Sequence, residues 1–194
     1  MDNLSVKQRL RKEFLRHRSS LDPDYRKQAD QAICVNLIQV PEIAAAKAAG
    51  AFITDGTEPD LSMFIEHAMQ SGIKIYLPRF TSDSGNRYEM VEIKDTRNDL
   101  IPGKYGIMEP GQGLKAASQD VLDTLIWLVP GVVFDSKGSR LGRGKGVYDR
   151  LLSKSSGIRI GIFYQCQENT EIPVEAHDCP LDMIVTEAGI SRFK

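Results

Sequence analysis

The chain has 194 residues, enough for one domain with a proper hydrophobic core, and its 41% hydrophobic and 26% charged residues are ordinary for a soluble globular protein. A formal net charge of −1 argues against non-specific binding of the whole molecule to nucleic acid or to a membrane surface. Three widely spaced cysteines without metal-ligand spacing, and no apolar run of about 18 residues, lead us to expect a cytoplasmic protein with reduced thiols.

The first half of the chain shows helical and strand patterns in alternation. Val6, Leu10 and Phe14 recur at helical spacing, and Pro23 stands where a second helix would begin. A strand–helix–strand order follows, which is typical of a parallel sheet with crossover helices. The expected elements are helices within residues 5–18, 21–40 and 59–72 and strands over residues 48–55 and 73–78.

The second half contains the strongest buried-strand pattern, TLIWLVPGVVFD at residues 124–135. We expect further strands over residues 88–93 and 158–164, a helix over residues 147–154, and one short strand in the tail. Residues 94–117 show no regular pattern, and such long connections usually carry function. The sequence therefore predicts one α/β domain over residues 1–194, with a mostly parallel, mixed, Rossmann-like sheet flanked by helices.

The stretch GSRLGRGKGVYDR at residues 138–150 combines glycines with positive charge at the end of a predicted strand. Glycines let backbone N–H groups converge, and ligands of open α/β sheets bind at the carboxyl ends of strands. The spacing fits neither the Walker A motif nor GxGxxG. We expect an anion site, most simply for a phosphate chain; the alternative is a glycine-rich turn with solvated arginines. Asp149 would either favour the helix dipole or hold Mg²⁺ beside the phosphates.

Residues 128–150, LVPGVVFDSKGSRLGRGKGVYDR, closely resemble the signature of the 5-formyltetrahydrofolate cyclo-ligase family, also called methenyltetrahydrofolate synthetases. The resemblance extends over the whole chain, in the same order. It includes Lys7-x-x-Leu10-Arg11, Glu58 in TDGTEPDLSMFI, KYGIMEP at 104–110 and IPVEAHDCPLDMIVTEAGI at 172–190.

The resemblance implies an ATP- and Mg²⁺-dependent conversion of 5-formyltetrahydrofolate to 5,10-methenyltetrahydrofolate, with release of ADP and phosphate. In that reaction the formyl oxygen is phosphorylated, and N10 of the folate then attacks the formyl carbon. Positioning and charge neutralisation matter more here than a nucleophilic side chain. This agrees with a sequence that shows no Ser/His/Asp or Cys/His constellation.

The resemblance also assigns residues to the nucleotide and the metal. Arg143 and Lys145 would neutralise the transferring phosphoryl group, and Asp149 and Asp178 would hold Mg²⁺. Without the family, Lys7 and Arg11 would look like a solvated basic helix face, and Asp178 like a turn residue. The residues expected to bind ATP are Lys7, Arg11, Arg140, Gly142, Arg143, Gly144, Lys145, Gly146 and Tyr148.

For the folate, the resemblance implies Ile53, Glu58, Tyr105 and Tyr148. The Glu58 carboxylate would accept hydrogen bonds from the pterin; on local pattern alone it belongs to a helix start. Val147 stands where the family usually has an aromatic residue; if that ring helps to wall the folate pocket, folate affinity or rate would differ here without a loss of activity.

We expect a monomer that acts on small molecules, with no nucleic-acid or membrane partner. Two other functions compete with the ligase. A non-catalytic regulator that binds nucleotide or folate would show no ADP release dependent on 5-formyltetrahydrofolate. A phosphosugar isomerase would work without ATP, but the sequence offers no evident acid/base pair for it.

Overall fold

The computed structural model describes residues 3–82, 87–176 and 178–193. In this part of the chain a seven-stranded sheet has the order β11-β10-β9-β6-β1-β2-β3. The five inner strands run parallel, and β3 and β11 pair antiparallel at the two edges. The predicted mostly parallel, mixed sheet is therefore confirmed. The strands of the sheet are β1 Ala48–Gly50, β2 Lys74–Ser82, β3 Arg87–Ile93, β6 Ile126–Pro130, β9 Arg159–Ile162, β10 Met183–Thr186 and β11 Gly189–Arg192.

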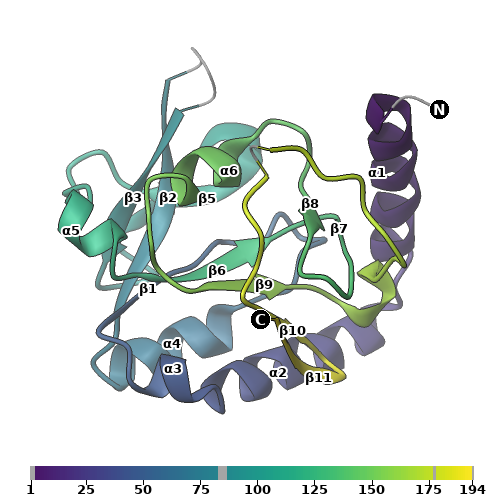
Figure 1. The fold of residues 1–194 in the computed structure, drawn as a ribbon. Helices are drawn as coiled ribbons and strands as arrows, with labels where there is room; N and C mark the ends of the chain where they lie inside the picture. Colours follow the sequence, from purple (N-terminus) through teal and green to yellow (C-terminus); the bar gives the residue numbers. More distant parts are fainter. Residues whose placement is uncertain (1–2, 83–86, 177, 194) are drawn as a thin grey trace.

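Helices cover both faces of the sheet (Figure 1). One core lies between the sheet and α2, α3 and α4, and a second lies between the sheet and α6. Alternate residues of the buried strands feed the two cores: Leu128 faces the first, and Trp127 and Val129 face the second. The helices are α1 Asn3–Ser19, α2 Pro23–Ile38, α3 Pro41–Ala44, α4 Ser62–Gln70, α5 Gln119–Leu122 and α6 Val147–Leu152, with 3₁₀ turns η1 Lys104–Gly106 and η2 Gln165–Gln167.

Helix α1 packs on a small hairpin formed by β7 Val133–Phe134 and β8 Arg140–Leu141. Leu10 and Phe14 of the helix join Val133 and Leu141 in a third apolar cluster. The hairpin leads directly into the glycine-rich loop. Its packing therefore brings the N-terminal helix to that loop.

Several sequence-based assignments were wrong. The strand expected over residues 124–135 is two strands, β6 and β7, with Gly131 between them at a point where a Cβ would lie 2.6 Å from the Phe163 ring. The strand expected over residues 48–55 ends at Gly50, and the chain continues without strand structure to a turn in which Asp55 Oδ1 accepts backbone N–H groups of Thr57 and Glu58.

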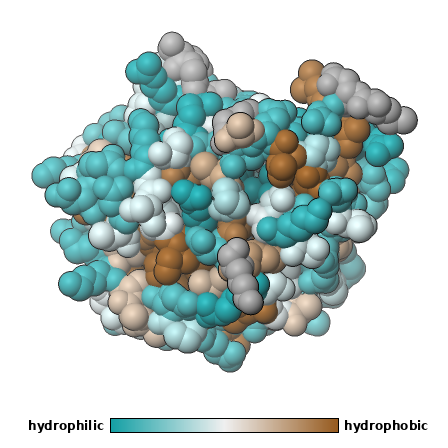
Figure 2. All heavy atoms as spheres, in the orientation of Figure 1, coloured by the Kyte–Doolittle hydropathy of each residue, from teal (hydrophilic) through white to brown (hydrophobic). Residues whose placement is uncertain are grey.

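The tail forms two strands rather than one, since β10 turns back into β11. The long segment 94–117, expected to be irregular, contains a short hairpin of β4 Leu100–Pro102 and β5 Met108–Pro110. Hydrophilic residues cover most of the face in Figure 2, and hydrophobic residues gather only in small groups. Among the described residues, no helix has the length and apolar character needed to cross a membrane.

Candidate active site

A cavity of about 700 Å³ lies at the carboxyl ends of β1 and β6, beside the middle of β2. Phe52 and Ile53 follow β1, Pro78 lies on β2, and Pro130 ends β6. This is where an open α/β sheet binds its ligands. All the residues assigned above to a site line this one cavity: Lys7, Arg11, Ile53, Glu58, Tyr105, Arg140, Gly142, Arg143, Gly144, Lys145, Gly146, Tyr148, Asp149 and Asp178. Their roles in binding stay predictions.

The glycine-rich loop forms one wall of the cavity and needs glycine at two positions. Gly144 has φ +86° and Gly146 has φ +59°, both in the left-handed region that side chains disfavour. A Cβ at Gly144 would also lie 3.1 Å from Cζ of Arg11. The close approach of the Arg11 guanidinium therefore depends on the missing side chain. Arg11 Nε in turn donates to the carbonyl of Gly142 at 2.9 Å, which fixes α1 against the loop.

Each of the two aspartates assigned to the metal contacts a cation. Asp149 accepts a hydrogen bond from Nη2 of Arg140 at 2.6 Å. Asp178 accepts one from Nζ of Lys7 at 3.0 Å, and Lys7 also lies 3.1 Å from Glu175. The Lys7 side chain is only 6% exposed, so it is not part of a solvated basic face. These ion pairs hold both carboxylates at the cavity wall.

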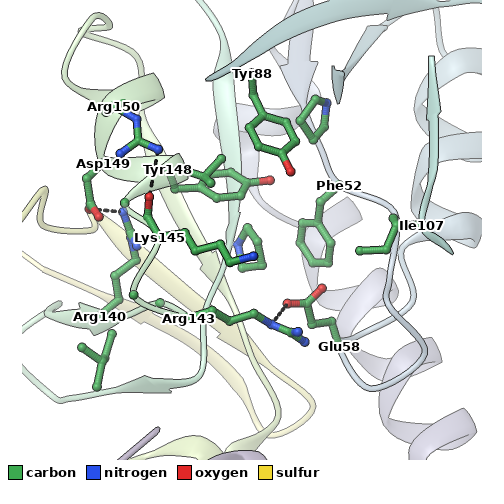
Figure 3. A pocket seen from close by; sticks show the side chains of 18 of the residues that line it. Phe52, Glu58, Tyr88, Ile107, Arg140, Arg143, Lys145, Tyr148, Asp149 and Arg150 are labelled. Carbon is green, nitrogen blue, oxygen red and sulfur yellow. Dashed lines mark hydrogen bonds and ion pairs between the residues drawn. The ribbon is translucent and has the colours of Figure 1, made fainter. Parts of the chain in front are cut away.

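Glu58 lies across the cavity from the glycine-rich loop, with Phe52 and Ile107 beside it (Figure 3). One carboxylate oxygen is 3.7 Å from Nε of Arg143 and 3.8 Å from Nη1 of Arg18. Burial raises the pKa of Glu58, and the charge of Arg18 opposes that shift. Arg143 also forms an ion pair with Asp55 in the same turn.

Tyr148 points from α6 into the cavity, close to Tyr88 (Figure 3). Its hydroxyl group is buried and has no hydrogen-bond partner among the described residues. Burial raises the pKa of this phenol, so the hydroxyl is protonated and can donate. A buried polar atom without a partner, aimed into a cavity, is suited to a ligand.

Tyr105 and Lys145 meet at the mouth of the cavity. Lys145 Nζ donates to the Tyr105 hydroxyl at 2.7 Å and lies 4.0 Å from the centroid of its ring. Tyr105 has φ +64°, the one positive value among the described residues other than glycine. The segment 104–106 therefore bridges to the glycine-rich loop, and the two sides of the cavity touch.

Sequence reasoning missed Arg18, Asp55, Phe52 and Tyr88. Arg18 had a usable signal, because it falls four residues after Phe14 on the buried face of α1, where an apolar residue is expected. Phe52 follows the first strand closely, so its place at a strand end was also predictable. Tyr88 lies on the antiparallel edge strand β3 and carries no local signal.

A model of the 5-formyltetrahydrofolate cyclo-ligase family matches residues 3–187 of the chain. The 5-formyltetrahydrofolate cyclo-ligase of Haemophilus influenzae is 30% identical over 191 residues, which cover 94% of this chain and 99% of that protein. The Escherichia coli protein of the same name is 29% identical over 181 residues, covering 89% and 96%.

Two solved structures share the fold. The NMR structure of Aquifex aeolicus 5,10-methenyltetrahydrofolate synthetase has a TM-score of 0.84 and 31% sequence identity, and the match covers 97% of this chain and 93% of that one. The Mycoplasma pneumoniae 5,10-methenyltetrahydrofolate synthetase, at 24% identity and a TM-score of 0.73, supports the fold alone.

Proposed function

The chain belongs to the 5-formyltetrahydrofolate cyclo-ligase family, and we propose that it cyclises 5-formyltetrahydrofolate to 5,10-methenyltetrahydrofolate with ATP and Mg²⁺, releasing ADP and phosphate. One observation carries this proposal: a single cavity has a glycine-rich basic side and an opposite side of apolar side chains around one carboxylate. The first suits a polyphosphate and the second a pterin ring. Both reactants of the cyclisation would then lie within one space.

The basic side has the donors that a triphosphate needs. Arg143 and Lys145 supply positive charge from the loop, and Lys7 and Arg11 supply it from α1. The left-handed glycines let the backbone approach a ligand closely. ATP, when bound, supplies the phosphoryl group that converts the formyl oxygen into a leaving group. The loop residues would orient the phosphates and neutralise their charge.

Asp149 and Asp178 would hold the Mg²⁺. Carboxylate oxygens are its preferred protein ligands, one or two of them usually suffice, and phosphate oxygens and water complete the coordination. The side chains of both aspartates line the same cavity as the basic loop. Arg140 and Lys7 contact them now, so a metal ion has to share these carboxylates with the cations or displace them.

The opposite side would bind the folate. The Glu58 carboxylate can accept paired hydrogen bonds from the amino and ring N–H groups of a pterin. Ile53 would pack against the ring, and the unpartnered Tyr148 hydroxyl would contact the substrate. Because N10 attacks within the same molecule, these residues need only hold the folate with N10 facing the formyl carbon. Tyr105, at the mouth, would close over the bound folate.

We further propose that the enzyme is a cytoplasmic monomer. One chain supplies every residue assigned to the site. No disulfide joins its three cysteines, all of which lie in the described part of the chain. Sedimentation of the purified protein with and without ATP tests the monomer.

The decisive experiment follows the absorbance of the methenyl product from 5-formyltetrahydrofolate, with ATP, without ATP, and with Mg²⁺ chelated. We expect product only when ATP and Mg²⁺ are both present, with one ADP released per product. Folate binding without ADP release would instead indicate a non-catalytic regulator. Product formation without ATP would overturn the mechanism.

A further inference from the structure

Arg18, in the last turn of α1, carries a guanidinium that is wholly buried, with 0% of its side chain exposed. It continues the apolar series Leu10 and Phe14 on the buried face of the helix. A charged side chain is almost never fully buried unless it is paired, because removal from water costs several kcal/mol, on the order of what a good ion pair returns. The contacts of Arg18 must therefore compensate for its burial.

Those contacts join two parts of the cavity wall. Nη1 donates to the carbonyl of Gly131, just beyond the end of β6, at 3.1 Å. Nη2 donates to Oγ1 of Thr57 at 2.8 Å. The same two nitrogens lie 3.8 Å from Glu58 and 3.9 Å from Asp55. One rigid guanidinium thus connects the central strand to the turn that carries Glu58.

Two other arginines lie near this turn, and they differ from Arg18 in exposure or in their contacts. Arg143 also reaches Asp55 and Glu58, but its side chain is 48% exposed and comes from the glycine-rich loop. It is the residue we assign to the phosphates. Arg26 of α2 donates to the carbonyl of Gly56. Among the described residues, no hydrogen bond or ion pair joins it to the carboxylates of Asp55 and Glu58. Arg18 is therefore the buried, fixed partner of Glu58.

We propose that Arg18 is a positioning residue, which holds the 55–58 turn against the end of β6 and aims the Glu58 carboxylate at the folate. The inference rests on the proposed function, in which Glu58 binds the pterin. Arg18 itself does not line the cavity, so it acts through Glu58 and does not touch the substrate. The planar guanidinium binds the turn and the Gly131 carbonyl at the same time. The single ammonium group of a lysine cannot reproduce this paired geometry.

The test compares two conservative variants. Arg18→Lys keeps the charge and loses the fork; Thr57→Val keeps the size of the side chain and loses the hydroxyl that accepts from Arg18 and donates to Asp55. Calorimetry gives the Kd of 5-formyltetrahydrofolate and of ATP for each variant, and thermal unfolding reports the fold. We expect folate affinity to fall about tenfold in Arg18→Lys and less in Thr57→Val, with ATP affinity unchanged, because the Glu58 carboxylate would lose its fixed position while the glycine-rich loop keeps its contacts. Should Arg18→Lys not fold, Thr57→Val alone decides.

Arg159→Lys is the control, since Arg159 also binds backbone carbonyls but lies outside the cavity. Unchanged folate affinity in Arg18→Lys and Thr57→Val, or equal losses of folate and ATP affinity, would overturn the inference and leave Arg18 a structural residue.

A further variant, Glu58→Gln, distinguishes a failure of this inference from a failure of the proposed function. If Glu58→Gln binds folate normally, the folate assignment itself is wrong; if it binds weakly while the Arg18 and Thr57 variants bind normally, only the role of Arg18 is wrong. In the Glu58→Gln background, Arg18→Lys should add little.

Discussion

Lys7 Nζ lies 3.0 Å from Oδ2 of Asp178, across 171 positions of sequence. The contact joins the first helix to the segment that precedes β10, and the Lys7 side chain is almost fully buried. A buried ion pair of this kind leaves an uncompensated charge if one partner is removed. In the proposed enzyme, Lys7 would hold a metal carboxylate in place and would also bring positive charge to the phosphates.

Replacing Lys7 should weaken ATP binding. We expect Lys7→Met to bind ATP about tenfold more weakly, the effect of losing one charge-assisted contact, and calorimetry measures it. Lys12→Met is the control on the same helix, because Lys12 is exposed. Deleting the first dozen residues is a poorer test, since it removes Leu10 from an apolar cluster. Equal ATP affinity in Lys7→Met and in the parent protein would contradict the nucleotide role.

Arg143 and Lys145 should matter mainly for rate. Loss of a fully engaged transition-state donor typically reduces turnover a hundredfold or more, about 3–4 kcal/mol. We expect Arg143→Ala and Lys145→Ala each to show such a loss in the methenyl-product assay. Lys154→Ala, a loss of charge at an exposed position just beyond α6, should be close to the parent protein. If both loop variants turn over normally, the loop is merely structural.

The sequence predicted the sheet and the glycine-rich loop because both depend on short-range signals. Buried strands such as IWLVP have an apolar pattern, and the glycine-rich loop has an unusual composition. The family resemblance added residues far apart in the chain, such as Lys7 and Asp178, which the structure brings into contact. Local pattern alone would have left Lys7 on a solvated helix face and Asp178 as a turn residue.

The contacts within the site were not predictable in this way. That Arg18 would reach Gly131 depends on the packing of α1 across the end of β6, which no local pattern encodes. The packing of the Phe163 ring, just beyond β9, into the space where a Cβ at position 131 would lie is likewise not encoded locally. Both features depend on long-range packing, and both involve Gly131, which lines the cavity.

Folate binding should depend on pH through Glu58. Burial raises the pKa of this carboxyl above its ordinary 4.5, opposed by Arg18, with Arg143 and Asp55 also close. Since the pterin needs the ionised form, folate affinity should be constant above the raised pKa and fall as the pH drops through it. The pH dependence of stability has the opposite sign. Because the pKa of Glu58 is raised by folding, its contribution to stability is present at low pH and is lost as the pH rises through the folded-state pKa.

Calorimetric titration of 5-formyltetrahydrofolate between pH 7 and the acid limit of stability measures this dependence. In Glu58→Gln the affinity should be lower throughout and should lack the acid decline. An identical decline in Glu58→Gln would assign the titration to another group.

The Tyr148 hydroxyl should serve binding rather than stability. It is buried without a partner among the described residues, so Tyr148→Phe removes an unsatisfied group and should leave the melting temperature unchanged or higher. Folate affinity should nevertheless fall, by about 1 kcal/mol for one neutral hydrogen bond. Tyr164→Phe is the matched control, because the Tyr164 hydroxyl donates to Asp30 at 2.7 Å outside the cavity. That variant should lose stability and keep its folate affinity; a Tyr148→Phe variant with the same pattern would refute the binding role.

Asp149 and Asp178 should act together on Mg²⁺. They lie 29 positions apart and each is bound by a different cation, while Cys179 Sγ, next to Asp178, donates to the carbonyl of Asp149 at 3.8 Å. Losing either acid should raise the Mg²⁺ concentration needed for half-maximal rate, because Mg²⁺ accepts one or two carboxylates and keeps several waters.

The test titrates Mg²⁺ against cyclisation rate in Asp149→Asn, Asp178→Asn and the double variant. Thermal unfolding without metal separates the loss of the ion pairs with Arg140 and Lys7 from the loss of the ligand. The double variant should require less additional Mg²⁺ than the two single effects predict, since once one ligand is gone the second has less to hold. Independent effects on the metal requirement would show that the two acids do not share an ion. Asp149 would then be only the partner of Arg140 in the first turn of α6.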